Sequence, residues 1–132
     1  MTAAKKILVV DDDVDLLDQA ELVLKGAGYD VVTAAGQEEA EEKLLSVRPD
    51  LCVVDLMMEA MDSGFVLCNN IKRLYPDAPV ILLTAVRSST GVDFTASDSE
   101  AGSWLKADAF LDKPVRPEQL REEVKRLLAA RE

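Results

Sequence analysis

Polar residues able to bind a metal ion or a phosphoryl group follow four short apolar runs of the chain. They are Asp11, Asp12 and Asp13 after the first of these runs, Asp55 after the second, Thr84 after the third and Lys113 after the fourth. Carboxylates that lie close together repel one another, and a bound divalent cation removes that repulsion. Oxygen ligands without histidine or thiolate select a hard ion, so Mg²⁺ is the expected metal.

The other polar groups suit a phosphoryl group bound beside that ion. Lys113 would neutralise one phosphoryl oxygen, and Thr84 would donate a hydrogen bond to another. One carboxylate would then be free to act as the nucleophile and form an acyl phosphate. Each residue also has a simpler explanation, because aspartates after a strand often cap a helix or form a turn, and a lone threonine or lysine is usually solvated. The complete set favours the phosphoryl site.

These residues can act together only if the fold brings them to one place. Apolar runs of strand length cover Ile7–Val10, Val31–Ala34, Leu51–Val54, Val80–Leu83 and Ala109–Leu111. Apolar residues at helical spacing lie between them, over Leu17–Ala27, Ala40–Val47 and Leu67–Leu74, and after Pro117 over Leu120–Leu128. This alternation predicts an α/β domain, a parallel sheet with helices on both faces. Ligands of such sheets bind beyond the carboxyl ends of the strands, where the polar residues are expected.

The composition excludes several other classes of protein. A length of 132 residues suits one domain, and an apolar fraction of 48% excludes a disordered chain. With 15 basic and 25 acidic residues the formal net charge is −10, so nucleic acid and anionic membrane surfaces are poor partners. The absence of histidine excludes a Ser-His-Asp triad, a histidine-rich zinc site and a phosphohistidine.

The cysteines and the start of the chain indicate where the protein acts. Cys52 and Cys68 lie in apolar runs and fit no metal or redox spacing, so buried thiols in a reducing compartment are expected. The first apolar run, Ile7–Val10, is too short for a signal peptide or a membrane span. A cytoplasmic location is the expectation.

Four segments, in order along the chain, carry a more specific pattern. They are Ile7–Asp13, Asp50–Met58, Pro79–Ala85 and Ala107–Pro114. Through them nearly the whole chain resembles the receiver domains of two-component response regulators. The resemblance implies a chemotaxis-regulator-like fold: one doubly wound, five-stranded parallel sheet of the flavodoxin-like class, with strand order 2-1-3-4-5. It also implies a single receiver domain over residues 1–132, with no output domain expected.

The resemblance implies a role for each acidic residue of the site. Asp55 is implied to be the phosphoacceptor, which takes its phosphoryl group from a histidine kinase or a histidine phosphotransfer protein. Asp12 would bind Mg²⁺ directly and Asp11 through water, while Asp55 and the backbone carbonyl of Met57 would complete the protein ligands. Because this chain has no histidine and no Gly-rich P-loop, the donor is expected to be a separate protein.

The resemblance also implies how phosphorylation would be transmitted. Thr84 resembles the switch hydroxyl, and Lys113 resembles the phosphoryl-binding lysine, with a cis peptide bond to Pro114. Phe110 resembles the switch aromatic that changes rotamer on phosphorylation. The output surface of the family lies on the fourth helix, fifth strand and fifth helix, where a downstream protein of unknown identity is expected to bind.

Two segments depart from the family pattern. After Asp55 the family usually continues with Pro-Gly-Met-Asp-Gly a few residues on, whereas this chain has Glu59–Gly64, with glutamate in place of proline and one added residue. The separation of Thr84 from Lys113 is several residues longer than usual. The excess falls in Val86–Lys106, which shows no clear helical stripe, so an atypical fourth helix region is expected.

Two other functions compete with a phosphorylated receiver. One is a pseudo-receiver, a binding module of the same fold that is not phosphorylated. The other is a phosphatase of the haloacid dehalogenase type, which needs a second aspartate two residues after its nucleophile. If Asp55 is the nucleophile, that position is occupied by Met57, which cannot transfer a proton. If Asp11 is the nucleophile, Asp13 fits that position, but Asp15 then stands where the motif has threonine or valine. The phosphorylated receiver is therefore favoured.

Overall fold

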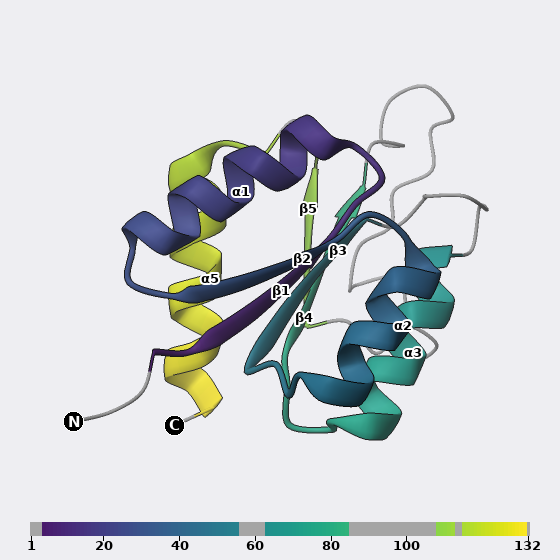
Figure 1. The fold of residues 1–132 in the computed structure, drawn as a ribbon. Coiled ribbons are helices and arrows are strands. Elements are labelled where there is room, and N and C mark those ends of the chain that lie inside the picture. The colour runs from purple at the N-terminus through teal and green to yellow at the C-terminus, as the bar shows by residue number, and fades with distance from the viewer. Residues whose placement is uncertain (1–3, 56–62, 85–107, 113–114, 132) are drawn as a thin grey trace, which may run out of the picture.

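A computed structural model of the chain describes residues 4–55, 63–84, 108–112 and 115–131. Its centre is a five-stranded parallel sheet of order β2-β1-β3-β4-β5, which confirms the predicted α/β flavodoxin-like fold (Figure 1). The strands are β1 (Lys6–Val10), β2 (Asp30–Ala34), β3 (Leu51–Asp55), β4 (Val80–Thr84) and β5 (Ala109–Asp112). The helices are α1 (Val14–Gly26), α2 (Gln37–Ser46), α3 (Ser63–Leu74) and α5 (Pro117–Arg131).

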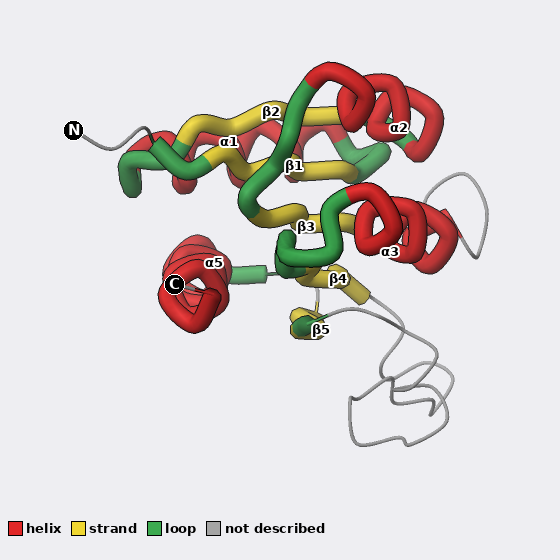
Figure 2. The backbone as a smooth tube through the Cα atoms, turned by 90° about the horizontal axis from the view of Figure 1, so that it is seen from below, coloured by secondary structure: helices red, strands yellow, loops and turns green. Residues whose placement is uncertain are grey.

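The helices form a layer on each face of the sheet. Helices α1 and α5 cover one face, and α2 and α3 cover the other (Figure 2). Successive side chains of a strand point to opposite faces. In β3, Leu51 and Val53 therefore pack under α1 and α5, while Cys52 and Val54 pack under α2 and α3. Burial on both faces explains why the strands read as continuous apolar runs.

Helix α1 begins and ends as its flanking residues predict. The Asp13 carboxylate caps it, accepting hydrogen bonds from the backbone N–H groups of Asp15 at 3.0 Å and Leu16 at 3.4 Å. At the other end Gly28, with φ of +98°, closes a Schellman motif in which the N–H of Tyr29 donates to the carbonyl of Leu24 at 3.1 Å. The expected glycine stop is confirmed, although Ala27 lies outside the helix and is exposed rather than part of its buried stripe.

Two other apolar positions are not where the helical spacing placed them. Val47 lies outside α2, as its extended C-cap residue. Leu74 is 51% exposed, because Tyr75 takes the position toward the core one turn after Ile71. The Tyr75 hydroxyl donates a hydrogen bond to the carbonyl of Leu44 at 2.6 Å, which ties the ends of α2 and α3 together.

Two aspartates align neighbouring strands at the amino edge of the sheet. The Asp50 carboxylate accepts from the N–H of Lys6 at 2.8 Å, and the Asp50 N–H donates to the carbonyl of Lys6 at 2.7 Å. Asp108 and Val80 exchange the same two hydrogen bonds, both at 2.8 Å. The Lys72 ammonium lies 2.8 Å from the Asp108 carboxylate, so this pair also joins α3 to the sheet.

We expect Asp108→Ala to lower the free energy of unfolding by about 1–3 kcal/mol. The change leaves the Val80 N–H without its acceptor and removes the carboxylate beside the Lys72 ammonium, which keeps only its hydrogen bond to the carbonyl of Ala78 at 2.9 Å. Urea unfolding followed by circular dichroism measures the loss, and Asp77→Ala, at an exposed position on the preceding turn, is the matched control. Equal unfolding midpoints for the two variants would show that the Asp108 contacts contribute nothing.

The two cysteines are free and buried, as expected. Cys52 of β3 is 0% exposed and Cys68 of α3 is 1% exposed. Burial raises the pKa of the Cys52 thiol far above its ordinary value; Cys68 adds to the rise and Lys72 opposes it. A buried thiol with a raised pKa is a poor nucleophile.

We therefore expect neither cysteine to react with iodoacetamide at pH 8 while the protein is folded, and both to react in urea. Intact mass after timed exposure counts the modified thiols. Alkylation of the folded protein at the rate of the unfolded chain would contradict the buried placement of these side chains.

Within the described residues, no helix has the length and apolar character needed to cross a membrane.

Candidate functional site

Adjacent strands bring the predicted acidic residues and the threonine to one edge of the sheet. Val10 of β1 pairs with Val54 of β3, so Asp11 and Asp55 lie one residue beyond a matched pair. On the other side of β3, Asp55 pairs with Leu83 of β4, and Thr84 follows. The carboxyl ends of three neighbouring strands therefore converge as the sequence predicts.

Three of the carboxylates form a compact group. One oxygen from each of Asp11, Asp12 and Asp55 lies within 4.8 Å of the others. Asp11 is completely buried and Asp55 is 5% exposed, whereas Asp12 is open to solvent. Two buried carboxylates beside a third repel one another strongly, because little water screens their charges. A cation would remove that repulsion, and it could reach the group from solvent at the exposed Asp12 side chain.

The aspartates of the run Asp11–Asp13 have two different roles, a candidate metal site and a helix cap, and the sequence allowed both. Asp13 is the N-cap of α1, as the simpler explanation predicted, while Asp11 and Asp12 belong to the carboxylate group. The Asp11 carboxylate accepts a hydrogen bond from the Asp13 N–H at 2.9 Å, which fixes the turn between strand and helix. The N–H of Asp11 also donates to the carbonyl of Ala34 at 3.1 Å, anchoring the residue to the end of β2. One hydrogen-bonded turn thus positions the site and starts the helix.

The donor set fits a hard divalent cation. Its three side chains offer only oxygen, and the described residues of the group include neither a thiolate nor an imidazole. Mg²⁺ prefers such ligands, takes one or two carboxylates from the protein and keeps several waters. Thr84 is 5% exposed and ends the next strand, one residue beyond the Leu83 that pairs with Asp55.

Several other predicted site residues lie outside the described part of the chain. These are Met57, Lys113 and Pro114. The divergent segment Val86–Lys106 also lies there, as does Glu59–Gly64 except for its last two residues. Phe110 is described: it lies in β5 beside Leu82 of β4 and packs, half-buried, against the core under α2 and α3.

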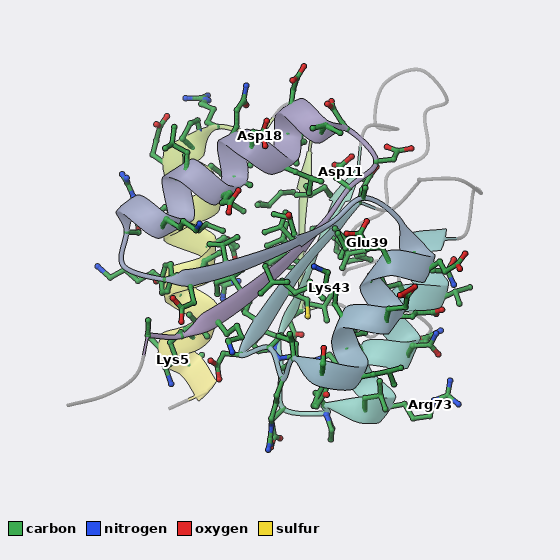
Figure 3. The ribbon with its side chains drawn as sticks, viewed as in Figure 1. Lys5, Asp11, Asp18, Glu39, Lys43 and Arg73 are labelled. Atoms are coloured by element: carbon green, nitrogen blue, oxygen red, sulfur yellow. The ribbon has the colours of Figure 1, made fainter. Side chains whose placement is uncertain are left out.

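One acidic residue at this edge was not anticipated. The Glu39 carboxylate accepts a hydrogen bond from the N–H of Ala35, just after β2, at 3.0 Å. Glu39 lies at the start of α2, near Asp11 in the view of Figure 3. A glutamate three residues after the N-cap Gly36 was the available signal, since glutamate at that helix position commonly reaches back to a backbone N–H. Its role is to begin the helix.

The chain is similar to known response regulators in sequence and in structure. A model of the response regulator receiver domain matches residues 7–125. A CheY-like receiver domain protein from Methanospirillum hungatei superposes with a TM-score of 0.81 at 29% identity, covering 97% of this chain and 96% of that one. The response regulator TrrA from Thermotoga maritima, solved in complex with Mg²⁺-BeF, superposes with a TM-score of 0.74 at 33% identity, covering 93% and 98%.

Curated relatives are longer than this chain. The alkaline phosphatase synthesis transcriptional regulatory protein PhoP of Bacillus subtilis is 35% identical over 124 residues, which are 94% of this chain and 48% of PhoP. The transcriptional regulatory protein YvrH of the same organism is 39% identical over 115 residues, 86% of this chain and 45% of YvrH. The chain spans about half the length of these relatives. Fold, acidic group and sequence together show that the chain belongs to the receiver domain family of two-component response regulators, signalling domains rather than conventional enzymes.

Proposed function

We propose that this chain is a phosphoacceptor in a two-component system or phosphorelay, and that Asp55 receives the phosphoryl group with the help of Mg²⁺. One observation carries the proposal. The Asp55 carboxylate ends a central strand, is almost completely buried and lies within 4.8 Å of carboxylate oxygens of Asp11 and Asp12. Thr84 ends the neighbouring strand.

The acidic residues would have two functions, binding of Mg²⁺ and nucleophilic attack on the phosphoryl group. Asp11, Asp12 and Asp55 would hold Mg²⁺, with the backbone carbonyl of Met57 as a further ligand. When bound, Mg²⁺ supplies positive charge that offsets the carboxylates and the phosphoryl oxygens. A carboxylate oxygen of Asp55 attacks phosphorus and forms an O–P bond. The P–N bond to the histidine of the donor breaks, and its electron pair stays on the imidazole nitrogen.

The neighbouring groups would stabilise the acyl phosphate after transfer. Thr84 donates its hydroxyl hydrogen to one phosphoryl oxygen, and Lys113 neutralises another. The movement of Thr84 toward the phosphoryl group leaves space that Phe110 fills by changing rotamer. This coupling would carry the signal to the surface that includes β5 and α5.

The proposed partners follow from the chemistry of the chain. A receiver domain implies a histidine kinase, and the donor is a histidine kinase or a histidine phosphotransfer protein, because this chain contains no histidine. Its net charge of −10 disfavours nucleic acid and anionic membranes as direct partners, so a downstream protein is the proposed target.

Incubation with acetyl phosphate tests the proposal without knowledge of the kinase. With Mg²⁺ present, the intact mass is expected to increase by one phosphoryl group. With EDTA in place of Mg²⁺, the mass is expected to stay unchanged. No increase with Mg²⁺, in a sample shown to be folded by circular dichroism, would favour the pseudo-receiver instead.

A further inference from the structure

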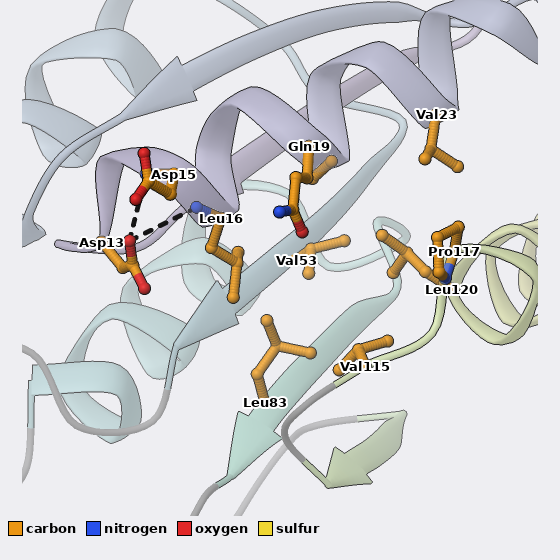
Figure 4. A pocket seen from close by; sticks show the side chains of 11 residues that line it. Asp13, Asp15, Leu16, Gln19, Val23, Val53, Leu83, Val115, Pro117 and Leu120 are labelled. Atoms are coloured by element: carbon orange, nitrogen blue, oxygen red, sulfur yellow. Dashed lines mark hydrogen bonds between the residues drawn. The ribbon is translucent and has the colours of Figure 1, made fainter.

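A cavity of about 370 Å³ lies between α1, α5 and the face of the sheet that they cover (Figure 4). Its volume lies within the range of small-molecule sites, about 300–1,000 Å³. Val53 of β3 and Leu83 of β4 form its floor, and Val23 of α1 and Leu120 of α5 line its sides. These side chains offer only hydrocarbon, so the interior suits the apolar part of a ligand.

The cavity arises from the residues that α1 turns toward α5. The core-facing side chains of α1 are Leu17, Ala20 and Leu24, and Ala20 has only a methyl group with which to fill the space. Gln19, one residue earlier, is exposed and extends into the opening in Figure 4. Its amide makes no hydrogen bond with another residue of the described chain. A small side chain beside a polar one therefore leaves the two helices incompletely packed.

The mouth of the cavity is acidic. Asp13 and Asp15 lie at the end nearest the start of α1, and the cavity-lining residues within the described part of the chain include no lysine or arginine. Both side chains are exposed, and the Asp13 carboxylate is engaged as the helix cap. Asp15 is available to a ligand at the opening. The net charge of −10 adds a negative field over the whole surface, which repels anions and attracts cations.

We propose that this cavity binds a small amphipathic cation, an arylalkylammonium or alkylammonium compound. The apolar body enters between Val23 and Leu120 and covers Val53 and Leu83. The ammonium group remains at the mouth, with Asp15 as its principal partner and the amide oxygen of Gln19 as a second acceptor. The proposal does not depend on phosphorylation of Asp55.

The cavity is separate from the carboxylate group but close to it in the chain. Asp13 follows Asp12 directly, and Val53 precedes Asp55 by two residues on the same strand. An ammonium ion could instead bind to Asp11, Asp12 and Asp55, so the test must distinguish the two places. Mg²⁺ in excess makes that distinction, since it competes for the carboxylate group and offers no apolar contact to the cavity.

The test is a titration of the ¹⁵N-labelled chain with 4-phenylbutylammonium in excess Mg²⁺, followed by NMR. Saturable shifts are expected at backbone amides around Val23, Val53 and Leu120, with a Kd on the order of 1 mM for a ligand of about ten non-hydrogen atoms. The uncharged 4-phenylbutanol is expected to bind about threefold to fivefold more weakly, as for loss of an exposed ion pair. The anion 4-phenylbutyrate is expected to bind more weakly still.

Three variants make the test specific. Val23→Phe fills the cavity and is expected to abolish binding, whereas Leu22→Phe adds a ring to the exposed side of the same helix and is expected to leave binding unchanged. Asp15→Asn keeps the cavity and is expected to remove the preference for the ammonium compound over the alcohol. This third variant does not depend on whether Val23→Phe folds.

Several results would overturn the proposal. The first is an absence of saturable shifts at tens of millimolar ligand, and the second is a set of shifts centred on Asp11, Asp12 and Asp55 that Mg²⁺ suppresses. The third is equal affinity for the cation and the anion. The fourth is that a folded Val23→Phe variant binds the ligand as tightly as the unmodified chain does.

Discussion

Asp55→Asn is expected to abolish uptake of a phosphoryl group from acetyl phosphate in the presence of Mg²⁺. Asparagine has nearly the shape of aspartate, so it can remain at the end of β3 without opening the core. Its amide lacks the negative charge and the nucleophilic oxygen that the reaction needs. Intact mass spectrometry measures the result, and we expect the phosphorylated fraction to fall below detection.

Asp13→Asn is the matched control for this experiment. Asp13 lies at the same edge of the sheet, but it caps α1 and does not belong to the carboxylate group. Asparagine caps a helix about as well as aspartate, so this variant should fold and accept phosphoryl groups as the original chain does. Full phosphorylation of Asp55→Asn, or loss of phosphorylation in both variants, would contradict the role given to Asp55.

Asp12→Asn is expected to weaken Mg²⁺ binding at least tenfold, because the exposed carboxylate is the one that an entering ion meets directly. The same change should raise the stability of the metal-free protein, since it removes one of three mutually repelling charges. Thermal unfolding with and without Mg²⁺ measures both effects. Mg²⁺ should raise the melting temperature of the original chain much more than that of the variant.

An exposed aspartate outside the site controls for general charge effects. Asp18 lies on α1, away from the carboxylate group (Figure 3). Asp18→Asn should leave both the metal-free stability and the Mg²⁺ response close to those of the original chain. If Mg²⁺ stabilised Asp12→Asn as much as the original chain, the proposed ligand would be wrong.

The sequence predicted the sheet well because its strands are buried on both faces. Runs such as Leu51–Val54 had to be continuous and apolar, and the helical stripes between them indicated a parallel sheet. The strand order 2-1-3-4-5 came from the family resemblance and is confirmed by the structure. Strand ends were the natural place to look for chemistry, and Asp11, Asp12, Asp55 and Thr84 lie there. Asp13 could not be separated from its neighbours by residue type, because a helix cap and a metal ligand both favour aspartate.

Other features depend on packing that a single sequence does not reveal. Spacing gave Leu74 a place in the core, but Tyr75 occupies that place and bonds the carbonyl of Leu44. The cavity beside Ala20 likewise depends on how α1 and α5 approach each other across the sheet. Met57 and Lys113 remain predictions from the family resemblance, and so does the atypical fourth helix expected in Val86–Lys106, which also lies outside the described residues.

The central claim is that Asp55 itself receives the phosphoryl group, and borohydride trapping tests it most directly. The chain is incubated with acetyl phosphate and Mg²⁺ and then treated with borohydride, which reduces an aspartyl phosphate to homoserine and releases phosphate. Peptide mass spectrometry locates the changed residue. We expect homoserine at position 55 alone, and only when Mg²⁺ was present. Homoserine at Asp11, Asp12 or any other residue, or none in a folded sample, would contradict it.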